Sequence, residues 1–208
     1  MIPVLEALEQ LRRGNRRFMA GRGEAYQQID QSHLREHVDG QTPIAVVLGC
    51  SDSRVPLEAV FDQGLGRLFV VRVAGNIAGS SQIGSIEYAV QQLGTRLVVV
   101  LGHTRCGAVR ATVEAVQRPG GVASEHLRGV VDAIRPSVEA LRATDGDGDV
   151  EAWAKRAVRA NVRAVVRRLR EDSQVIASLI QTDGLRVVGA EYALETGVVD
   201  FFEAVPVS

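Results

Sequence analysis

The chain has 208 residues, of which 46% are hydrophobic, and this is enough for a globular domain with a substantial core. A formal net charge of -1 gives no long-range attraction to nucleic acids or anionic membranes, and an aromatic content of 4% offers little for stacking on single-stranded nucleic acid. The longest apolar stretch, residues 97–101, is too short to cross a bilayer, and no apolar run follows a basic start as in a secretory signal. We therefore expect a cytoplasmic protein without membrane or nucleic-acid partners.

The first forty residues predict a helical arm. Residues 3–20 carry apolar side chains at helical spacing on one face, and four arginines lie off that face. The apolar residues of this face are Leu5, Leu8, Leu11 and Phe18. A polar stretch over residues 21–40 follows, and within it we expect a short helix at 33–38.

Short apolar runs that alternate with helical patterns follow the arm. The runs have the length of strands and cover residues 44–48, 68–72, 96–101 and 185–189. Helical patterns cover residues 56–63, 81–93, 108–116, 124–143 and 151–170. Continuous β-branched strands alternating with helices predict an α/β fold. We expect a central, mostly parallel sheet of four parallel strands, open to an added edge strand and flanked by α-helices.

The organisation along the chain predicts a single domain over residues 1–208. The helical arm would occupy residues 1–40 and the α/β core residues 41–208. Loop-forming residues stand at 119–121, where Pro-Gly-Gly occurs, and at 145–149, where Asp and Gly alternate. These two loops should separate the later helices of the core.

Two of the predicted strands are followed by side chains that bind metals. Cys50 follows the first strand, and His103 and Cys106 follow the third. In open α/β sheets, ligands bind beyond the carboxyl ends of the strands. Two thiolates and one imidazole suit a borderline-soft cation, for which zinc is the common choice. The sequence therefore predicts a zinc site formed by Cys50, His103 and Cys106.

The nature of this site stays open from the residues alone. Three protein ligands leave a fourth position for water, which is the catalytic arrangement, but Asp52 as a fourth ligand would make the site structural. A disulfide or two buried free thiols is the alternative to a metal, and neither would need His103. Asp52 and Arg54 stand two residues apart, so an extended chain would let them pair. This pair is either a loop salt bridge or an oriented carboxylate beside the metal-bound water.

An ordered set of motifs extends this pattern over nearly the whole chain. Its two central motifs are Cys-Ser-Asp-Ser-Arg at residues 50–54 and His-Thr-Arg-Cys-Gly at residues 103–107. Further motifs stand at residues 14–18, 72–76, 87–90 and 189–192, with Thr196 and Gly197 near the end. Together these motifs resemble those of the β-class carbonic anhydrases.

The resemblance implies the reversible hydration of carbon dioxide to bicarbonate and a proton. It implies that Cys50, His103 and Cys106 bind Zn²⁺ and that Asp52 and Arg54 form the catalytic dyad. Zinc would lower the pKa of its water to about 7, and the resulting hydroxide would attack CO₂. Asp52 would accept the hydrogen bond of this hydroxide and orient it, while Arg54 would keep Asp52 ionised.

The resemblance also implies a substrate cleft and an assembly. Matching positions place Gln41, Phe69, Ala74 and Tyr88 in the lining of the CO₂ and bicarbonate cleft. The resemblance implies a homodimer or a homotetramer formed by pairing of dimers, with the N-terminal helices extending to a partner subunit. We therefore expect a homo-oligomer whose other partner is the small-molecule substrate.

Some positions depart from the family pattern, and other activities stay open. In some members the counterpart of Asp52 closes the site by binding zinc, and a subset regulates this through a Trp three residues before the first Cys. That position is Val47 here, so we do not expect this regulation; Val73 and Ala193 also replace the usual Asn and Asp. Hydrolysis of carbonyl sulfide or carbon disulfide on the same scaffold is one alternative. Another is a non-catalytic zinc-stabilised assembly module with Asp52 permanently on the metal, although such a site would not need Arg54.

Overall fold

The computed structural model describes residues 2–24, 30–118, 124–145 and 149–204. Within them, one sheet contains strands β1 (Ala45–Gly49), β2 (Leu68–Arg72), β3 (Leu97–His103), β4 (Arg186–Tyr192) and β5 (Val199–Glu203). The strand order is β2-β1-β3-β4-β5, in which β5 is antiparallel to β4 and the other neighbours are parallel. The predicted α/β fold, with four parallel strands and an added edge strand, is thereby confirmed.

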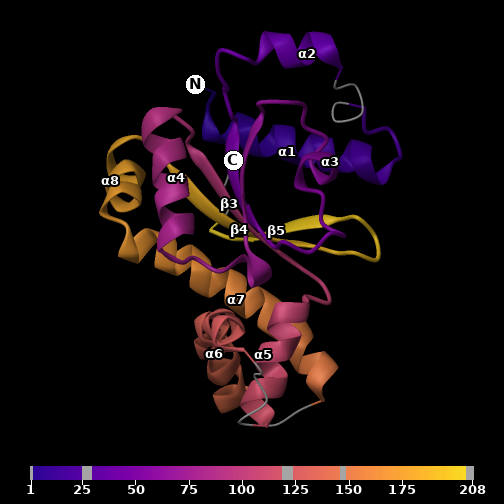
Figure 1. Ribbon diagram of the computed structural model, residues 1–208, viewed down its shortest axis with the longest axis vertical. Helices are drawn as coiled ribbons and strands as arrows, with labels where there is room; N and C mark the ends of the chain where they lie inside the picture. Colours follow the sequence, from indigo (N-terminus) through magenta and orange to yellow (C-terminus); the bar gives the residue numbers. More distant parts are fainter. Residues whose placement is uncertain (1, 25–29, 119–123, 146–148, 205–208) are drawn as a thin grey trace.

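Helices cover both faces of this sheet (Figure 1). They are α1 (Val4–Met19), α2 (Gln31–Glu36), α3 (Leu57–Val60), η1 (Ala74–Asn76), α4 (Ser80–Gln92), α5 (Gly107–Gln117), α6 (Glu125–Asp145), α7 (Val150–Asp172) and α8 (Gln174–Thr182). Helices α5 and α6 lie together beyond one end of the sheet, and α7 leads from them along the sheet to α8. None of the helices in the described ranges is long and apolar enough to cross a membrane.

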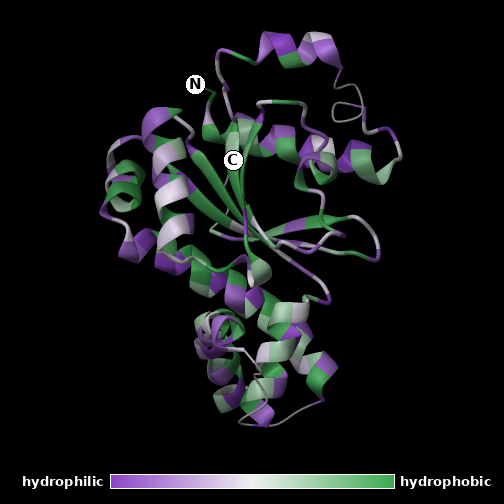
Figure 2. Ribbon diagram, viewed as in Figure 1, coloured by the Kyte–Doolittle hydropathy of each residue, from purple (hydrophilic) through white to green (hydrophobic). Residues whose placement is uncertain are grey.

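The alternation of side chains along the strands explains the two covered faces. Val47 and Val99 point into the core beneath α1 and α3, whereas Val46 and Val98 pack against α4, α7 and α8. Successive side chains of a strand point to opposite faces, so a strand covered on both faces must be apolar throughout. Figure 2 shows the parallel strands at the centre of the sheet as mostly green.

A third apolar cluster joins the sheet to the helices α5, α6 and α7. It contains Cys50 and Cys106 together with Val109, Ile134 and Trp153, all of which are buried. The two cysteines therefore lie where the sheet meets this group of helices, and they are shielded from bulk water.

Some predicted boundaries were wrong, and some elements were not predicted. Strand β3 runs two residues further than expected because Gly102 and His103 continue the pairing with β4. Helix α3 is only four residues long, and helix α8 had no prediction. The loop predicted at 119–121 lies outside the described residues, as does most of the one at 145–149.

Candidate metal centre

The predicted ligands meet at the carboxyl edge of the parallel sheet. Cys50 follows β1 directly, His103 is the last residue of β3, and Cys106 caps the N-terminus of α5. Strands β1 and β3 are parallel neighbours in which Gly49 lies opposite Leu101, so both chains leave the sheet side by side. The two sulfurs and the imidazole of these residues lie within 4.8 Å of one another, and all three residues are buried.

The separation of the two sulfurs fits a shared cation. Both cysteines are free, and the distance between their Sγ atoms is 4.0 Å, which is not that of a disulfide. Two sulfurs bound to one tetrahedral zinc, each at about 2.3 Å, would lie about 3.8 Å apart. The residues present therefore fit zinc without rearrangement of the loop ends.

His103 presents a lone pair to the same point. Its Nδ1 lies 2.9 Å from the carbonyl oxygen of Thr104, and because a carbonyl only accepts, Nδ1 carries the proton. The Nε2 atom is then the unprotonated nitrogen, and it is buried without a hydrogen-bond partner. A buried polar atom without a partner is costly, and a metal ion is the partner that the neighbouring thiols also require.

The two thiols have different electrostatic surroundings. Donation from the Cys106 thiol, together with the Gly75 amide, lowers the pKa of Cys50, whereas the bond to Cys50 and burial raise the pKa of Cys106. The Gly75 amide approaches Cys50 Sγ at 3.4 Å. Gly75 has a φ of 70°, and a Cβ there would lie 2.6 Å from Ile134 Cδ1, so only glycine allows this approach.

Asp52 and Arg54 form the pair predicted from their spacing. Arg54 Nε and Nη2 donate to the two carboxylate oxygens of Asp52 at 3.0 and 2.8 Å, and the Arg54 amide donates to Oδ1. These bonds from Arg54 lower the pKa of Asp52, which stays ionised. Asp52 Oδ2 lies 3.9 Å from His103 Nε2, so the carboxylate stands beside the ligand group.

Arg72 supports the same loop from β2. Its Nε donates to the carbonyl of Cys50 at 2.9 Å and its Nη2 to the carbonyl of Asp52 at 2.7 Å. Sequence reasoning placed residue 72 in a motif but assigned it no contact. Its position at the end of a strand beside β1 was the available signal.

The residues predicted for the substrate cleft come from different parts of the fold: the segment before β1, β2, η1 and α4. Ala74 precedes Gly75 and is therefore close to Cys50. Phe69 and Tyr88 form a tilted ring pair with centroids 6.1 Å apart on β2 and α4, and 52% of the Tyr88 surface is exposed. Gln41 is exposed and borders a separate hollow. Their role in a cleft remains a prediction.

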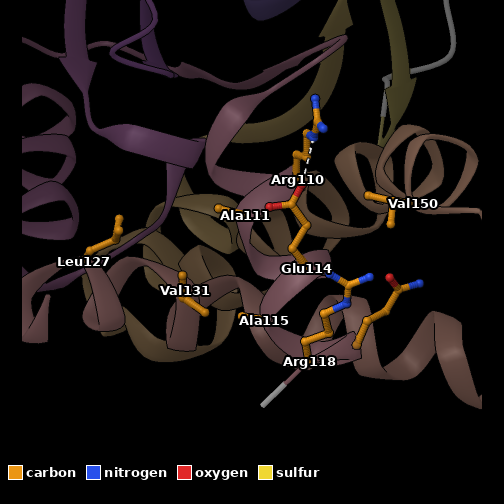
Figure 3. Close-up of a pocket in the computed structure, with 9 residues that line it drawn as sticks. Arg110, Ala111, Glu114, Ala115, Arg118, Leu127, Val131 and Val150 are labelled. Carbon is orange, nitrogen blue, oxygen red and sulfur yellow. Dashed lines mark hydrogen bonds and ion pairs between the residues drawn. The ribbon is translucent and has the colours of Figure 1, made fainter. Parts of the chain in front are cut away.

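A different hollow, of about 460 Å³, lies between α5, α6 and the start of α7 (Figure 3). Ala111, Leu127 and Val131 line its apolar part, and Arg110 and Glu114 form an ion pair of 3.0 Å at its rim. None of the three candidate metal ligands lines it.

The fold and the ligand group define a class of protein: an α/β metalloprotein with a Cys₂His site at the carboxyl edge of its parallel sheet. Comparisons with known proteins agree with this class and point to one family within it. The family model described as carbonic anhydrase matches residues 45–199. Carbonic anhydrase 2 of Mycobacterium tuberculosis is 43% identical over 195 residues, which cover 92% of this chain and 89% of the relative.

Solved structures resemble the whole architecture. A β-carbonic anhydrase of Aspergillus fumigatus superposes with a TM-score of 0.75 at 27% identity, over 85% of this chain and 83% of that one. A tetrameric β-carbonic anhydrase of Sordaria macrospora has a TM-score of 0.71 at 25% identity, over 83% of this chain and 89% of that one. The chain belongs to the β-class of the carbonic anhydrase family, so it is a lyase with a zinc cofactor.

Proposed function

We propose that the chain catalyses the reversible hydration of carbon dioxide to bicarbonate and a proton, with Asp52 and Arg54 as the catalytic dyad. The observation that carries this proposal is the Asp52 carboxylate, which Arg54 holds with two hydrogen bonds beside the unpartnered Nε2 of His103. A purely structural zinc site would use the carboxylate as a ligand and would have no need of this restraint.

Cys50, His103 and Cys106 would hold zinc, which supplies a water molecule with its pKa lowered to about 7 and so a nucleophile at neutral pH. The residues around it hold and orient this nucleophile. Asp52 is an acceptor only, because Arg54 keeps it ionised, and it can therefore orient an O–H group beside His103. Arg54 also donates to the carbonyl of Arg105 at 3.3 Å, which anchors the dyad to the loop between the ligands.

We further propose that Gln41, Phe69, Ala74 and Tyr88 line the substrate cleft. CO₂ is small and apolar, so a wall of aromatic and aliphatic groups such as the Phe69–Tyr88 pair suits it. The exposed Gln41 amide offers a donor for a bicarbonate oxygen. Gln41 and Tyr88 are exposed in one chain, so a second subunit would close the cleft over them.

We propose a homo-oligomer of single-domain chains, with residues 1–40 as the arm that reaches a partner. Its support is a set of large apolar side chains that are exposed in one chain outside α6: Leu5, Met19, Leu34, Val38, Tyr88 and Val198. The Sordaria relative is described as tetrameric. A cytoplasmic location is part of the proposal, since reduced thiols are needed to bind the metal.

Stopped-flow CO₂ hydration at pH 8.5 tests the function. Zinc-loaded wild type should hydrate CO₂ well above buffer, and Asp52→Asn should lower kcat/KM by about 100-fold or more while zinc content stays unchanged. Asp172→Asn is the matched control, because Asp172 also pairs with an arginine, Arg168 at 3.0 Å, but on α7. This control should keep full activity.

The same assay separates the alternatives. Zinc-loaded protein without hydration above buffer would refute the proposal and favour a non-catalytic zinc-stabilised module. Turnover of carbonyl sulfide or carbon disulfide without CO₂ hydration would favour a hydrolase on this scaffold. Full activity of Asp52→Asn would remove the dyad from the mechanism while leaving the reaction in place.

A further inference from the structure

The two residues between the metal ligands orient the site with their backbone. The carbonyl of Thr104 accepts from His103 Nδ1 at 2.9 Å, and the carbonyl of Arg105 accepts from Arg54 Nη2 at 3.3 Å. Arg105 has a φ of 56°, in the left-handed region that a non-glycine residue rarely adopts. Such a conformation persists only where the surroundings hold it in place.

Glu195 accepts hydrogen bonds from the side chains of both residues. Thr104 Oγ1 donates to Glu195 Oε2 at 2.8 Å, and Arg105 Nε donates to Glu195 Oε1 at 2.7 Å. The amide of Leu194, next to Glu195, donates to Thr104 Oγ1 at 3.0 Å. Both side chains of the loop thus meet one carboxylate, 90 residues further along the chain.

The turn that carries Glu195 is itself well anchored. The amide of Ala193 donates to the carbonyl of Val198 at 2.9 Å, and the amide of Gly197 donates to the carbonyl of Ala193 at 2.8 Å. Asn15 of α1 donates to the carbonyl of Gly197 at 2.8 Å. Glu195, held in this turn, therefore fixes the position of the loop between His103 and Cys106.

A contribution to global stability does not account for this arrangement. The side chains of Arg105 and Glu195 are 65% and 45% exposed, and exposed ion pairs contribute little to folding. The Glu195 carboxylate accepts hydrogen bonds from the side chains of both Thr104 and Arg105. The backbone carbonyls of these two residues orient the metal ligand His103 and the arginine of the dyad, Arg54. Groups that orient the ligands of a metal from outside have measurable effects on metal affinity.

We propose that Glu195 is a positioning residue of the metal centre. It fixes Thr104 so that His103 keeps Nδ1 protonated and Nε2 directed to the metal, and it fixes Arg105 so that its carbonyl holds Arg54. The proposal rests on the metal site and the dyad of the proposed function. It assigns Glu195 no contact with the substrate.

Metal binding provides the test, through zinc affinity from chelator competition and through the absorption spectrum of the Co²⁺-substituted full-length protein. Glu195→Ala should weaken zinc binding by about 10-fold and shift the cobalt bands, with a thermal midpoint within about 2 °C of wild type. Glu195→Gln keeps an acceptor for Thr104 and should restore the affinity to within about twofold. Glu203→Ala is the control. Glu203 lies on β5, the strand that follows the same turn, and pairs with Arg163 of α7 at 3.1 Å.

The outcomes are distinct from those of the proposed function, because neither readout requires turnover. Glu195→Ala with wild-type zinc affinity and an unchanged cobalt spectrum overturns the positioning role. If Glu195→Gln weakens zinc binding as much as Glu195→Ala does, the part assigned to the hydrogen bond from Thr104 is overturned. A wild type that binds zinc but lacks CO₂ hydration refutes the proposed function and leaves this measurement intact.

Discussion

At the scale of single residues, the site is governed by groups that can make only one kind of hydrogen bond. The Thr104 carbonyl only accepts, so it sets the proton on His103 Nδ1 and exposes Nε2 to a metal. Arg54 only donates, so it keeps Asp52 an ionised acceptor. A carboxylate that is held by a two-pronged guanidinium stands near the metal position without being free to bind there.

Arg54→Gln is predicted to abolish most CO₂ hydration while the protein keeps one zinc per chain. The neutral amide loses the two-pronged charged contact, so Asp52 is no longer restrained beside His103 and can turn toward the metal. Stopped-flow hydration together with metal analysis measures both quantities, and a loss of about 100-fold is expected. Arg168→Gln, which breaks the Asp172 pair on α7, should change neither. Hydration by Arg54→Gln at the wild-type rate would contradict the role of the pair.

At the scale of elements, the N-terminal helix is fitted closely to the core. A Cβ at Gly14 would lie 1.7 Å from the carbonyl oxygen of Phe61, so α1 approaches the end of α3 with no room for a side chain. Asn15 is buried beside it and donates to the carbonyls of Val60 and Gly197 while accepting from the amide of Val199. Helix α1 is thus bound to its own chain on one face.

Gly14→Ala is predicted to lower the free energy of unfolding by about 3 kcal/mol, because α1 must move away from backbone atoms that cannot yield. Gly129→Ala in α6 is the matched control, since the residue is helical and a Cβ added to it would meet nothing within 4 Å. This control should raise the free energy of unfolding by about 0.4–1 kcal/mol. Urea titration followed by circular dichroism measures both, and equal values for the two variants would refute the close-approach argument.

Asn15→Ala is predicted to destabilise the protein by about 2–4 kcal/mol, because it removes the partner of two buried backbone groups and one partly buried one. Glu6→Ala, on the exposed side of the same helix, should change the free energy of unfolding by less than about 0.5 kcal/mol. The same urea titrations provide the measurement. If Asn15 contributes no more than Glu6, the hydrogen bonds from α1 do not anchor the β4–β5 turn.

At the scale of the whole molecule, one chain leaves apolar side chains exposed on α1, α2 and α4. Tyr88, the partner of Phe69 in the ring pair, is half exposed, and Leu5 on α1 is 50% exposed. Burial of such groups at a subunit interface would exclude water from both the interface and the cleft. In the proposed homo-oligomer, we therefore expect the completeness of the substrate cleft to depend on the oligomeric state.

Leu5→Glu is predicted to shift the protein toward the monomer and to lower hydration activity, because a charge at an apolar interface must be desolvated. Leu127→Glu is the control, since Leu127 is similarly exposed, at 45%, but lies on α6. Sedimentation velocity at micromolar concentration measures the oligomer. An unchanged oligomer in Leu5→Glu, or an equal shift in both variants, would place the interface away from α1.

Local patterns in the sequence were sufficient for the four parallel strands, most of the helices and the three metal ligands. A fully buried strand must be apolar throughout, and metal chemistry requires particular side chains, so both are visible in single segments. The edge strand β5 was left open because it has only five residues. Helix α8 was not predicted, although Val175, Ile176, Leu179 and Ile180 stand at helical spacing in its nine residues.

The positions of these residues relative to one another required the tertiary structure. His103 belongs to β3 only because β4 continues to pair with it, and the loop after it is held by Glu195 from the far end of the chain. The sequence names Asp52 and Arg54 as partners, yet their placement beside His103 Nε2 depends on the register of β1 against β3. Contacts between distant segments arise from packing in the folded chain. Local sequence patterns therefore do not predict them.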